Sequence, residues 1–245
     1  MAERVEWRSQ GCASILPQSV LWSRLRHSGA CGDDMTRILG RFALALLGLF
    51  AVTQANAHPH VWVTMKSEMV YGPDSTATGV RHAWTFDDMF STFATQGLES
   101  KEKGKFTREE LAPLAEVNIT SMKEFDYFTM ARQNGKKTEF GSPTDYWLEL
   151  KDGLLTLYFT LPFKTPAKAQ SIDLEIYDSM YFVDFSFAEK EPVRLVGAPG
   201  ECKLSVTRPG ESAQKGKPGE AFFNNLAPGT NFGAQFANRI SVQCP

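Results

Sequence analysis

The sequence predicts an α+β protein that is mainly antiparallel β, arranged as a two-sheet sandwich with an inserted pair of helices. Short stretches of alternating apolar and polar residues recur along the chain, as is typical of strands with one buried face. Turn-forming pairs such as Asp152-Gly153 separate several of these stretches. A stretch with helical spacing, at about residues 87–124, interrupts the pattern. Chains of this kind bury their apolar faces by packing one sheet on another.

Residues 35–57 have the features of a secretory signal. Arginines come first, an apolar stretch runs from Phe42 to Val52, and the small residues Ala55-Asn56-Ala57 follow. The apolar stretch is too short to cross a bilayer, which takes about 20 residues. We therefore expect cleavage after the small residues and export to the periplasm, with an uncleaved anchor as the alternative. The working protein would be one β-rich domain over residues 58–245 that does not span the membrane.

Composition limits the classes of partner. The chain carries 28 acidic and 26 basic side chains, and no basic stripe stands out, so we do not expect it to bind nucleic acid. No nucleophile elbow, phosphate loop or zinc-protease helix occurs in the sequence, and we expect the protein not to be an enzyme. Residues 1–34 show no periodicity, and we expect them to be a spurious upstream extension or to be discarded with the signal.

Turn residues and alternation predict where the strands lie. Gly72-Pro73-Asp74-Ser75 separates the first two strands, and Asp152-Gly153 separates the clearest hairpin. The expected strands cover residues 61–71, 76–86, 127–130, 146–150, 154–161, 172–177, 181–187, 193–196, 204–206 and 240–244. A short helix is expected to start at Asp87 as its N-cap, with Phe90, Phe93 and Ala94 on one face.

A second helix is expected to begin at Thr107. Thr107 and Glu110 have the spacing of a capping box, in which each side chain bonds the backbone of the other residue. Residues 99–110 also have the spacing of an EF-hand loop, but Lys101 and Lys103 stand where calcium needs oxygen ligands. We therefore do not expect calcium to bind there.

Cys202 and Cys244 are the cysteines that remain after cleavage. An even pair in an exported chain predicts a disulfide that ties the C-terminus to the strand near Leu204. The alternative is a metal site that uses cysteine, and the spacing matches no common zinc pattern.

Three histidines fall close together in the sequence, at His58, His60 and His82. Imidazole is a favoured ligand of nickel, cobalt, zinc and copper, because it is neutral near pH 7 with one free nitrogen. The pattern His-x-Trp occurs twice, ending at Trp62 and at Trp84. Residues two apart on a strand point to the same side, so each histidine would lie beside a tryptophan. The alternative is two amphipathic strands whose histidines lie at an edge.

The strand register selects among these candidates. A tight hairpin centred near Pro73-Asp74 would pair positions whose numbers sum to about 147. His60 would then face Asp87, and His82 would face Met65, roughly 17 Å from His60 along the strand. The simplest hairpin therefore groups His58 and His60 with Asp87 and leaves His82 outside.

Two carboxylates complete the candidate metal ligands, and both have a structural alternative. Asp87 could cap the first helix. Asp178 follows an alternating stretch at a strand junction, where a turn-forming aspartate is common. If cleavage leaves His58 as the first residue, its amine and ring could form a copper brace. Pro59 has no N–H and excludes the other N-terminal copper motif, which needs amide nitrogens.

The sequence resembles a bacterial family of exported proteins labelled as the periplasmic component of an uncharacterised ABC-type transport system. The resemblance covers the mature chain and rests on short motifs: His58-Pro59-His60-Val61-Trp62, His82-x-Trp84-x-Phe86-Asp87, Glu109-Glu110-Leu111, Tyr177-Asp178 with Tyr181-Phe182, the Cys202 region and residues 232–239. Proteins of this family are often encoded beside nickel/cobalt-type permeases, which implies a role in handling metal.

These observations together predict a periplasmic protein that binds nickel, cobalt, zinc or copper as an accessory to a membrane metal permease. The expected ligands are His58 and His60, followed by His82, Asp87 and Asp178. One alternative is an N-terminal-histidine copper enzyme. The other is a metal-free structural or interaction module of a transport complex, with tryptophan and phenylalanine side chains forming a docking face.

Overall fold

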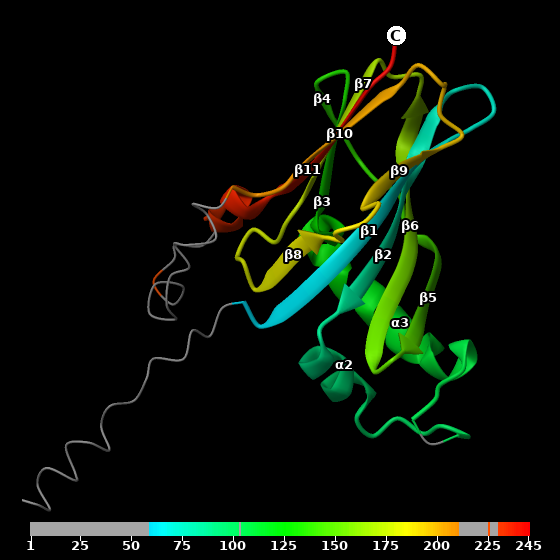
Figure 1. The fold of residues 1–245 in the computed structure, drawn as a ribbon, viewed down its shortest axis with the longest axis vertical. Coiled ribbons are helices and arrows are strands. Elements are labelled where there is room, and N and C mark those ends of the chain that lie inside the picture. The colour runs from blue at the N-terminus through cyan, green and yellow to red at the C-terminus, as the bar shows by residue number, and fades with distance from the viewer. Residues whose placement is uncertain (1–58, 103, 211–224, 226–229) are drawn as a thin grey trace, which may run out of the picture. The chain divides into compact units, whose positions relative to one another are not determined.

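Two β-sheets and the helices α2 and α3 make up the fold of the residues that the structure describes (Figure 1). The structure is a computed structural model, and it describes residues 59–102, 104–210, 225 and 230–245. The first sheet has the order β5 (Thr144–Lys151), β6 (Leu154–Ala167), β2 (Ala77–Phe86), β1 (Val61–Tyr71) and β8 (Val183–Phe187), and β9 (Val193–Val196) also pairs with β1. The second sheet has the order β10 (Lys203–Thr207), β11 (Asn238–Gln243), β7 (Ser171–Ile176), β3 (Thr129–Gln133) and β4 (Lys136–Thr138).

The two sheets share one apolar core. Val63 and Leu157 from the first sheet belong to the same buried cluster as Leu174 and Ile240 from the second. The prediction of a mainly β protein with two sheets and a helical insertion is therefore confirmed in outline. Not all the pairing is antiparallel, because β8 and β9 both run parallel to β1.

The β1–β2 hairpin has a register different from the predicted one. Ser67 lies opposite His82, so paired positions sum to 149, and the expected pairing of His82 with Met65 is wrong. The cause is the loop, which is wider than a tight turn. The Gly72 N–H donates to the Thr76 carbonyl at 2.8 Å, Ser75 has a left-handed backbone, and a bulge follows Val70.

Helices α2 (Asp88–Thr95) and α3 (Arg108–Met122) lie between β2 and β3 in the sequence. Both begin as predicted, with Asp87 capping α2 and a capping box between Thr107 and Glu110 at α3. The buried face of α2 differs from the prediction. Phe90 and Ala94 pack on the core, but Phe93 is 75% exposed.

Ser91 explains this rotation of α2. Its hydroxyl donates to the Asp87 carbonyl and accepts a hydrogen bond from the buried Leu155 N–H at 2.9 Å. The helix is thereby turned so that a serine faces the core and Phe93 faces away from it. A 3-10 segment, η1 (Lys123–Phe128), leads from α3 into β3.

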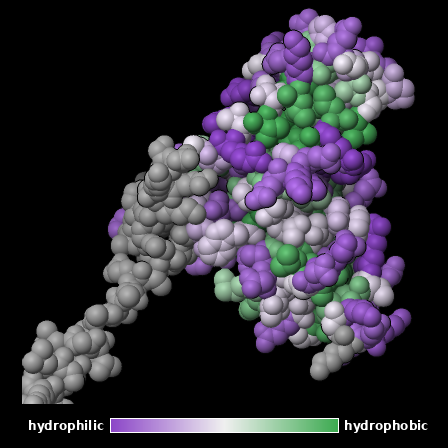
Figure 2. All heavy atoms as spheres, viewed as in Figure 1, coloured by the Kyte–Doolittle hydropathy of each residue, from purple (hydrophilic) through white to green (hydrophobic). Residues whose placement is uncertain are grey.

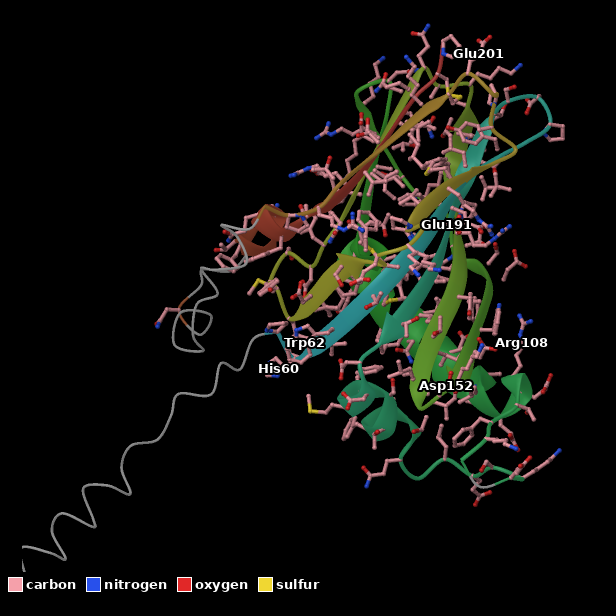
Figure 3. The ribbon with its side chains drawn as sticks, in the orientation of Figure 1. His60, Trp62, Arg108, Asp152, Glu191 and Glu201 are labelled. Carbon is pink, nitrogen blue, oxygen red and sulfur yellow. A yellow bond between two sulfur atoms is a disulfide. The ribbon has the colours of Figure 1, made fainter. Side chains whose placement is uncertain are left out.

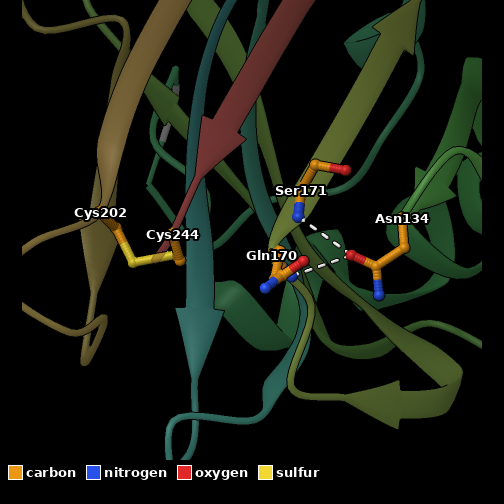
Figure 4. The surroundings of a disulfide bond; sticks show 5 residues. All are labelled: Asn134, Gln170, Ser171, Cys202 and Cys244. Atoms are coloured by element: carbon orange, nitrogen blue, oxygen red, sulfur yellow. Dashed lines mark hydrogen bonds between the residues drawn. A yellow bond between two sulfur atoms is a disulfide. The ribbon is translucent and has the colours of Figure 1, made fainter.

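The predicted disulfide between Cys202 and Cys244 is present (Figure 4). Cys202 precedes β10, Cys244 follows β11, and these strands pair in antiparallel fashion, so the bond closes one end of the second sheet. Near it, the Asn134 side chain accepts hydrogen bonds from the N–H groups of Gln170 and Ser171. Among the described residues, no helix is both long and apolar enough to cross a membrane.

Figure 2 shows mostly hydrophilic side chains over the visible face of the first sheet, with an apolar stretch over β9 and β10. The hydrophilic side chains include a charged group in which Glu68 bonds both Arg81 and Arg194. That group joins β1, β2 and β9 across the solvent side of the sheet.

Candidate functional site

His60 lies immediately before β1, near the N-terminal end of the described chain (Figure 3). Its side chain is exposed, and its ring packs against the Phe182 ring with a centroid separation of 4.5 Å. Its backbone N–H donates to the Phe182 carbonyl at 2.9 Å. The neighbouring candidate, His58, lies outside the described residues. His60 is therefore a surface imidazole on a backbone held by the loop before β8.

Asp87 lies at the junction of β2 and α2, and it contacts Trp62 rather than His60. Oδ2 accepts the Trp62 N–H at 2.9 Å, and Oδ1 accepts the Phe90 N–H at 2.9 Å. The Asp87 N–H in turn donates to the Trp62 carbonyl at 3.0 Å. The predicted pairing of His60 with Asp87 is therefore wrong by two residues. Both carboxylate oxygens already accept backbone N–H groups, and the bond from Phe90 is the helix-cap role that the sequence left open.

His82 points into the core between the sheets and is 1% exposed. Its Nδ1 lies 2.9 Å from the Ser67 hydroxyl, and its Nε2 lies 3.5 Å from the Thr129 hydroxyl. Burial lowers the pKa of His82 from 6.5 to about 3, so the ring is neutral at pH 7. Its partner Ser67 is seven residues from His60, roughly 24 Å along the strand. The structure therefore does not bring His82 to His60.

Asp178 is buried, and its carboxylate organises the loop that leads into β8. Oδ1 accepts the Met180 N–H at 3.0 Å, and Oδ2 accepts the N–H groups of Phe182 and Val183 at 2.8 and 3.0 Å. This is the turn-forming role that the sequence offered as the alternative to metal binding. Because Phe182 supports the His60 ring, Asp178 acts on the candidate site through this loop.

A glycine fixes the same loop from the other side. The Gly233 N–H donates to the Ser179 carbonyl at 2.8 Å, and a Cβ at position 233 would lie 1.7 Å from the Asp178 carbonyl oxygen. Next to this contact, the Tyr181 ring stacks on Phe236 at 3.9 Å. The segment η2 (Phe232–Phe236) thus packs against the 178–182 loop.

The structure brings three of the predicted residues to one end of the first sheet. His60, Asp87 and Asp178 do not bond one another there; each lies on a segment that backbone hydrogen bonds join to the start of β1 or to the loop before β8. In the described ranges, no three His, Cys, Asp or Glu side chains lie close enough together to hold one metal ion. A metal at His60 would therefore need His58, the chain's amino group or another molecule to complete its coordination.

The loop before α3 has a structural explanation for its EF-hand spacing. Glu110 uses one carboxylate oxygen for the Thr107 N–H and the other for the Lys101 N–H. Its acidic twelfth position therefore serves the capping box and closes the loop.

The sequence offered a docking face of tryptophan and phenylalanine side chains as an alternative, but it did not identify which apolar residues would be exposed. Trp62 and Phe182 are 43% and 47% exposed, and Met89 and Phe93 of α2 are 61% and 75% exposed. These four residues come from three separate segments, so no spacing rule links them. The sequence of α2 did carry one signal. Once Asp87 caps the helix, Ser91 can face the core together with Phe90 and Ala94, and Phe93 then faces outward.

Comparison with known proteins gives a family and no activity. Residues 43–244 match the family described as "Protein of unknown function (DUF1007)". The chain is 25% identical over 206 residues to an "Uncharacterized protein" of Haemophilus influenzae, covering 81% of this chain and 97% of that one. It is 33% identical over 93 residues to an "Uncharacterized 15.5 kDa protein in trpE 3'region" of Spirochaeta aurantia, covering 38% of this chain and 66% of that one. The match over most of its length shows that this chain belongs to the DUF1007 family of proteins of unknown function.

Proposed function

We propose that this protein is exported to the periplasm and there binds a late divalent transition metal ion through His58 and His60. The observation that carries the proposal is the position of His60, a surface imidazole next to a second histidine in the sequence. Imidazole pairs favour nickel, cobalt, zinc and copper over magnesium and calcium. The buried environment of His82 and the backbone contacts of Asp87 and Asp178 make these three residues supports of the fold in this proposal.

The role in transport is the second part of the proposal. The protein would pass its metal ion to or from a membrane metal permease, as its resemblance to proteins encoded beside nickel/cobalt-type permeases suggests. Two histidines near a chain terminus leave open coordination positions, which suits exchange of a metal ion more than permanent storage. If cleavage exposes the amine of His58, that amine would supply a further nitrogen ligand.

Calorimetric titration with nickel, zinc, cobalt and copper(II) tests metal binding. The wild-type protein starting at His58 is expected to bind at least one of these ions, and the His58→Ala/His60→Ala double variant is expected to bind it at least about a hundred-fold more weakly. His82→Gln is the matched control, because it removes a histidine away from the site. The proposal fails if the double variant binds every ion as well as the wild type does, or if the wild type binds none.

A further inference from the structure

Four paired residues form a row across the solvent side of the first sheet. Trp147 of β5 lies opposite Tyr158 of β6, and Tyr158 lies opposite Ala83 of β2. Ala83 in turn lies opposite Lys66 of β1. The four strands lie side by side in this order in Figure 1. Because paired residues point to the same side of a sheet, the four side chains are neighbours, and three large side chains share the row with one alanine.

The aromatic side chains of this row form a stack that stops at Ala83. The Trp147 and Tyr158 rings are 4.0 Å apart between centroids, with 9° between their planes, and the Arg108 guanidinium lies 4.8 Å from the Trp147 centroid. Neighbouring strands are about 4.8 Å apart, so about 9–10 Å separates β6 from β1 across β2. The methyl group of Ala83 does not fill this width, so the row has a gap between Tyr158 and Lys66.

A cavity of about 300 Å³ lies at this gap. Ala83 and its two neighbours in the row line it, and four charged residues contribute to the rest of the lining: Glu68, Arg81, Glu191 and Arg194. A flat ring needs about 3.5–4 Å between its plane and the carbon atoms on each side, so the width across β2 admits one ring. Trp147 stacks on Tyr158, and the Tyr158 hydroxyl donates to Glu149 at 3.2 Å. The aromatic wall of the cavity is therefore held in place before any ligand arrives.

The charged residues that line the cavity carry a net positive charge. Lys66, Arg81 and Arg194 are three cations, whereas Glu68 and Glu191 are two carboxylates. Partial burial opposes ionisation of Glu68, but hydrogen bonds from Arg194 and Arg81 lower its pKa, so Glu68 is ionised and holds both guanidinium groups. Lys66 forms no ion pair with any carboxylate in the described part of the chain. Arg81 uses only one nitrogen atom for Glu68. Donors for an anionic group therefore remain beside the gap.

We propose that this cavity binds a small planar aromatic anion. Its ring would lie above Ala83 and continue the stack of Trp147 and Tyr158, with its other face towards the Lys66 side chain. Its carboxylate or phosphate group would meet the ammonium of Lys66 and the guanidinium of Arg81. An inorganic anion would leave the Tyr158 ring uncovered, and a neutral ring would leave the excess positive charge unpaired. The proposal is independent of metal binding, because none of these residues is a proposed metal ligand.

Four small probes separate the contributions of the ring and of the charge. Benzoate and phenyl phosphate are flat anions, cyclohexanecarboxylate is an anion without a flat ring, and benzamide is flat but uncharged. Each is titrated into the protein starting at His58, with ligand signals followed by NMR at low salt. At least one flat anion is expected to bind at least about ten-fold more tightly than both cyclohexanecarboxylate and benzamide.

Two variants with matched controls locate the binding. Ala83→Phe places a ring of the protein in the gap and should weaken binding of the flat anion by at least about ten-fold. Thr64→Phe adds the same ring on the same side of the sheet, outside the cavity lining, and should leave binding unchanged. Lys66→Gln should weaken binding by at least about three-fold, whereas Lys151→Gln, which changes an exposed lysine of β5, should not.

Several outcomes would overturn the proposal. The proposal fails if neither flat anion binds, if cyclohexanecarboxylate binds as tightly as benzoate, or if benzamide does. Full binding by Ala83→Phe would place the ligand elsewhere. Urea unfolding shows whether Ala83→Phe folds, and if it does not, unchanged binding by Lys66→Gln refutes the site on its own. Metal titration of both variants should match the wild type, so failure of this site remains distinct from failure of the metal proposal.

Discussion

The buried imidazole of His82 makes the stability of this protein depend on pH. The pKa of His82 is about 3 in the folded protein and 6.5 for an unburied histidine, so protonation favours the unfolded chain. Above pH 6.5 the neutral ring has no such effect. As the pH falls from 6.5 towards 3, the free energy of unfolding decreases by about 1.36 kcal/mol per pH unit. The loss is about 2 kcal/mol at pH 5 and about 4 kcal/mol at pH 3.

Urea unfolding of wild type and His82→Gln at pH 7.5 and pH 5 isolates this effect. Glutamine carries no charge at either pH and keeps a polar group near Ser67. Effects of the carboxylates are common to both proteins and cancel in the comparison. We expect the wild type to lose about 2 kcal/mol more than the variant between the two pH values. Equal losses would refute the reasoning, and His60→Gln, which changes a surface histidine, serves as the control.

Three further predictions concern the parts of the fold that hold the candidate site. Replacing both Cys202 and Cys244 by alanine opens a loop with a sequence separation of 42. In urea titrations, this change should lower the free energy of unfolding by about 4 kcal/mol. The control is the reduced wild-type protein, whose free energy of unfolding should equal that of the double variant. Asp178→Ala leaves three backbone N–H groups without their acceptor, so it should lower the free energy of unfolding by about 3 kcal/mol. Asp178→Asn should lower it by less. Equal free energies of unfolding for the wild type and both variants would contradict this role of Asp178. Gly233→Ala should lower the free energy of unfolding by about 3 kcal/mol, and with it the midpoint of thermal unfolding, because the added methyl group would collide with the Asp178 carbonyl. An unchanged midpoint would show that η2 can shift to make room for the methyl group.

Local signals allowed much of the fold to be predicted. The capping box at Thr107, the Asp152-Gly153 turn and the Cys202–Cys244 pair are each determined by residues close in sequence or by simple pairing, and all three are present. The register of β1 and β2 could not be read in the same way. It depends on how the loop around Ser75 folds on itself, and a shift of two residues moved Asp87 from His60 to Trp62.

The candidate site was harder to predict because its contacts join residues that are far apart in the sequence. The period of two correctly placed His82 and Trp84 on one face of their strand, and both are buried. The alternation could not show which side of the first sheet packs on the second sheet, the side of His82 or the side of His60. The contact between His60 and Phe182 joins residues more than 120 positions apart, and no pattern within either segment specifies it.

The pairing of β1 with both β8 and β9 has a consequence for the order of folding. Along that edge, Val61 pairs with Val183 and Ser67 pairs with Val193. This edge of β1 can therefore pair only after residues more than 120 positions later in the sequence have been synthesised. Until they arrive, a nascent chain can form the β1–β2 hairpin but leaves the opposite edge of β1 unpaired. Long-range pairing of this kind slows folding and exposes a strand edge to other chains. A chaperone that shields this edge would therefore act chiefly before the last third of the domain is complete.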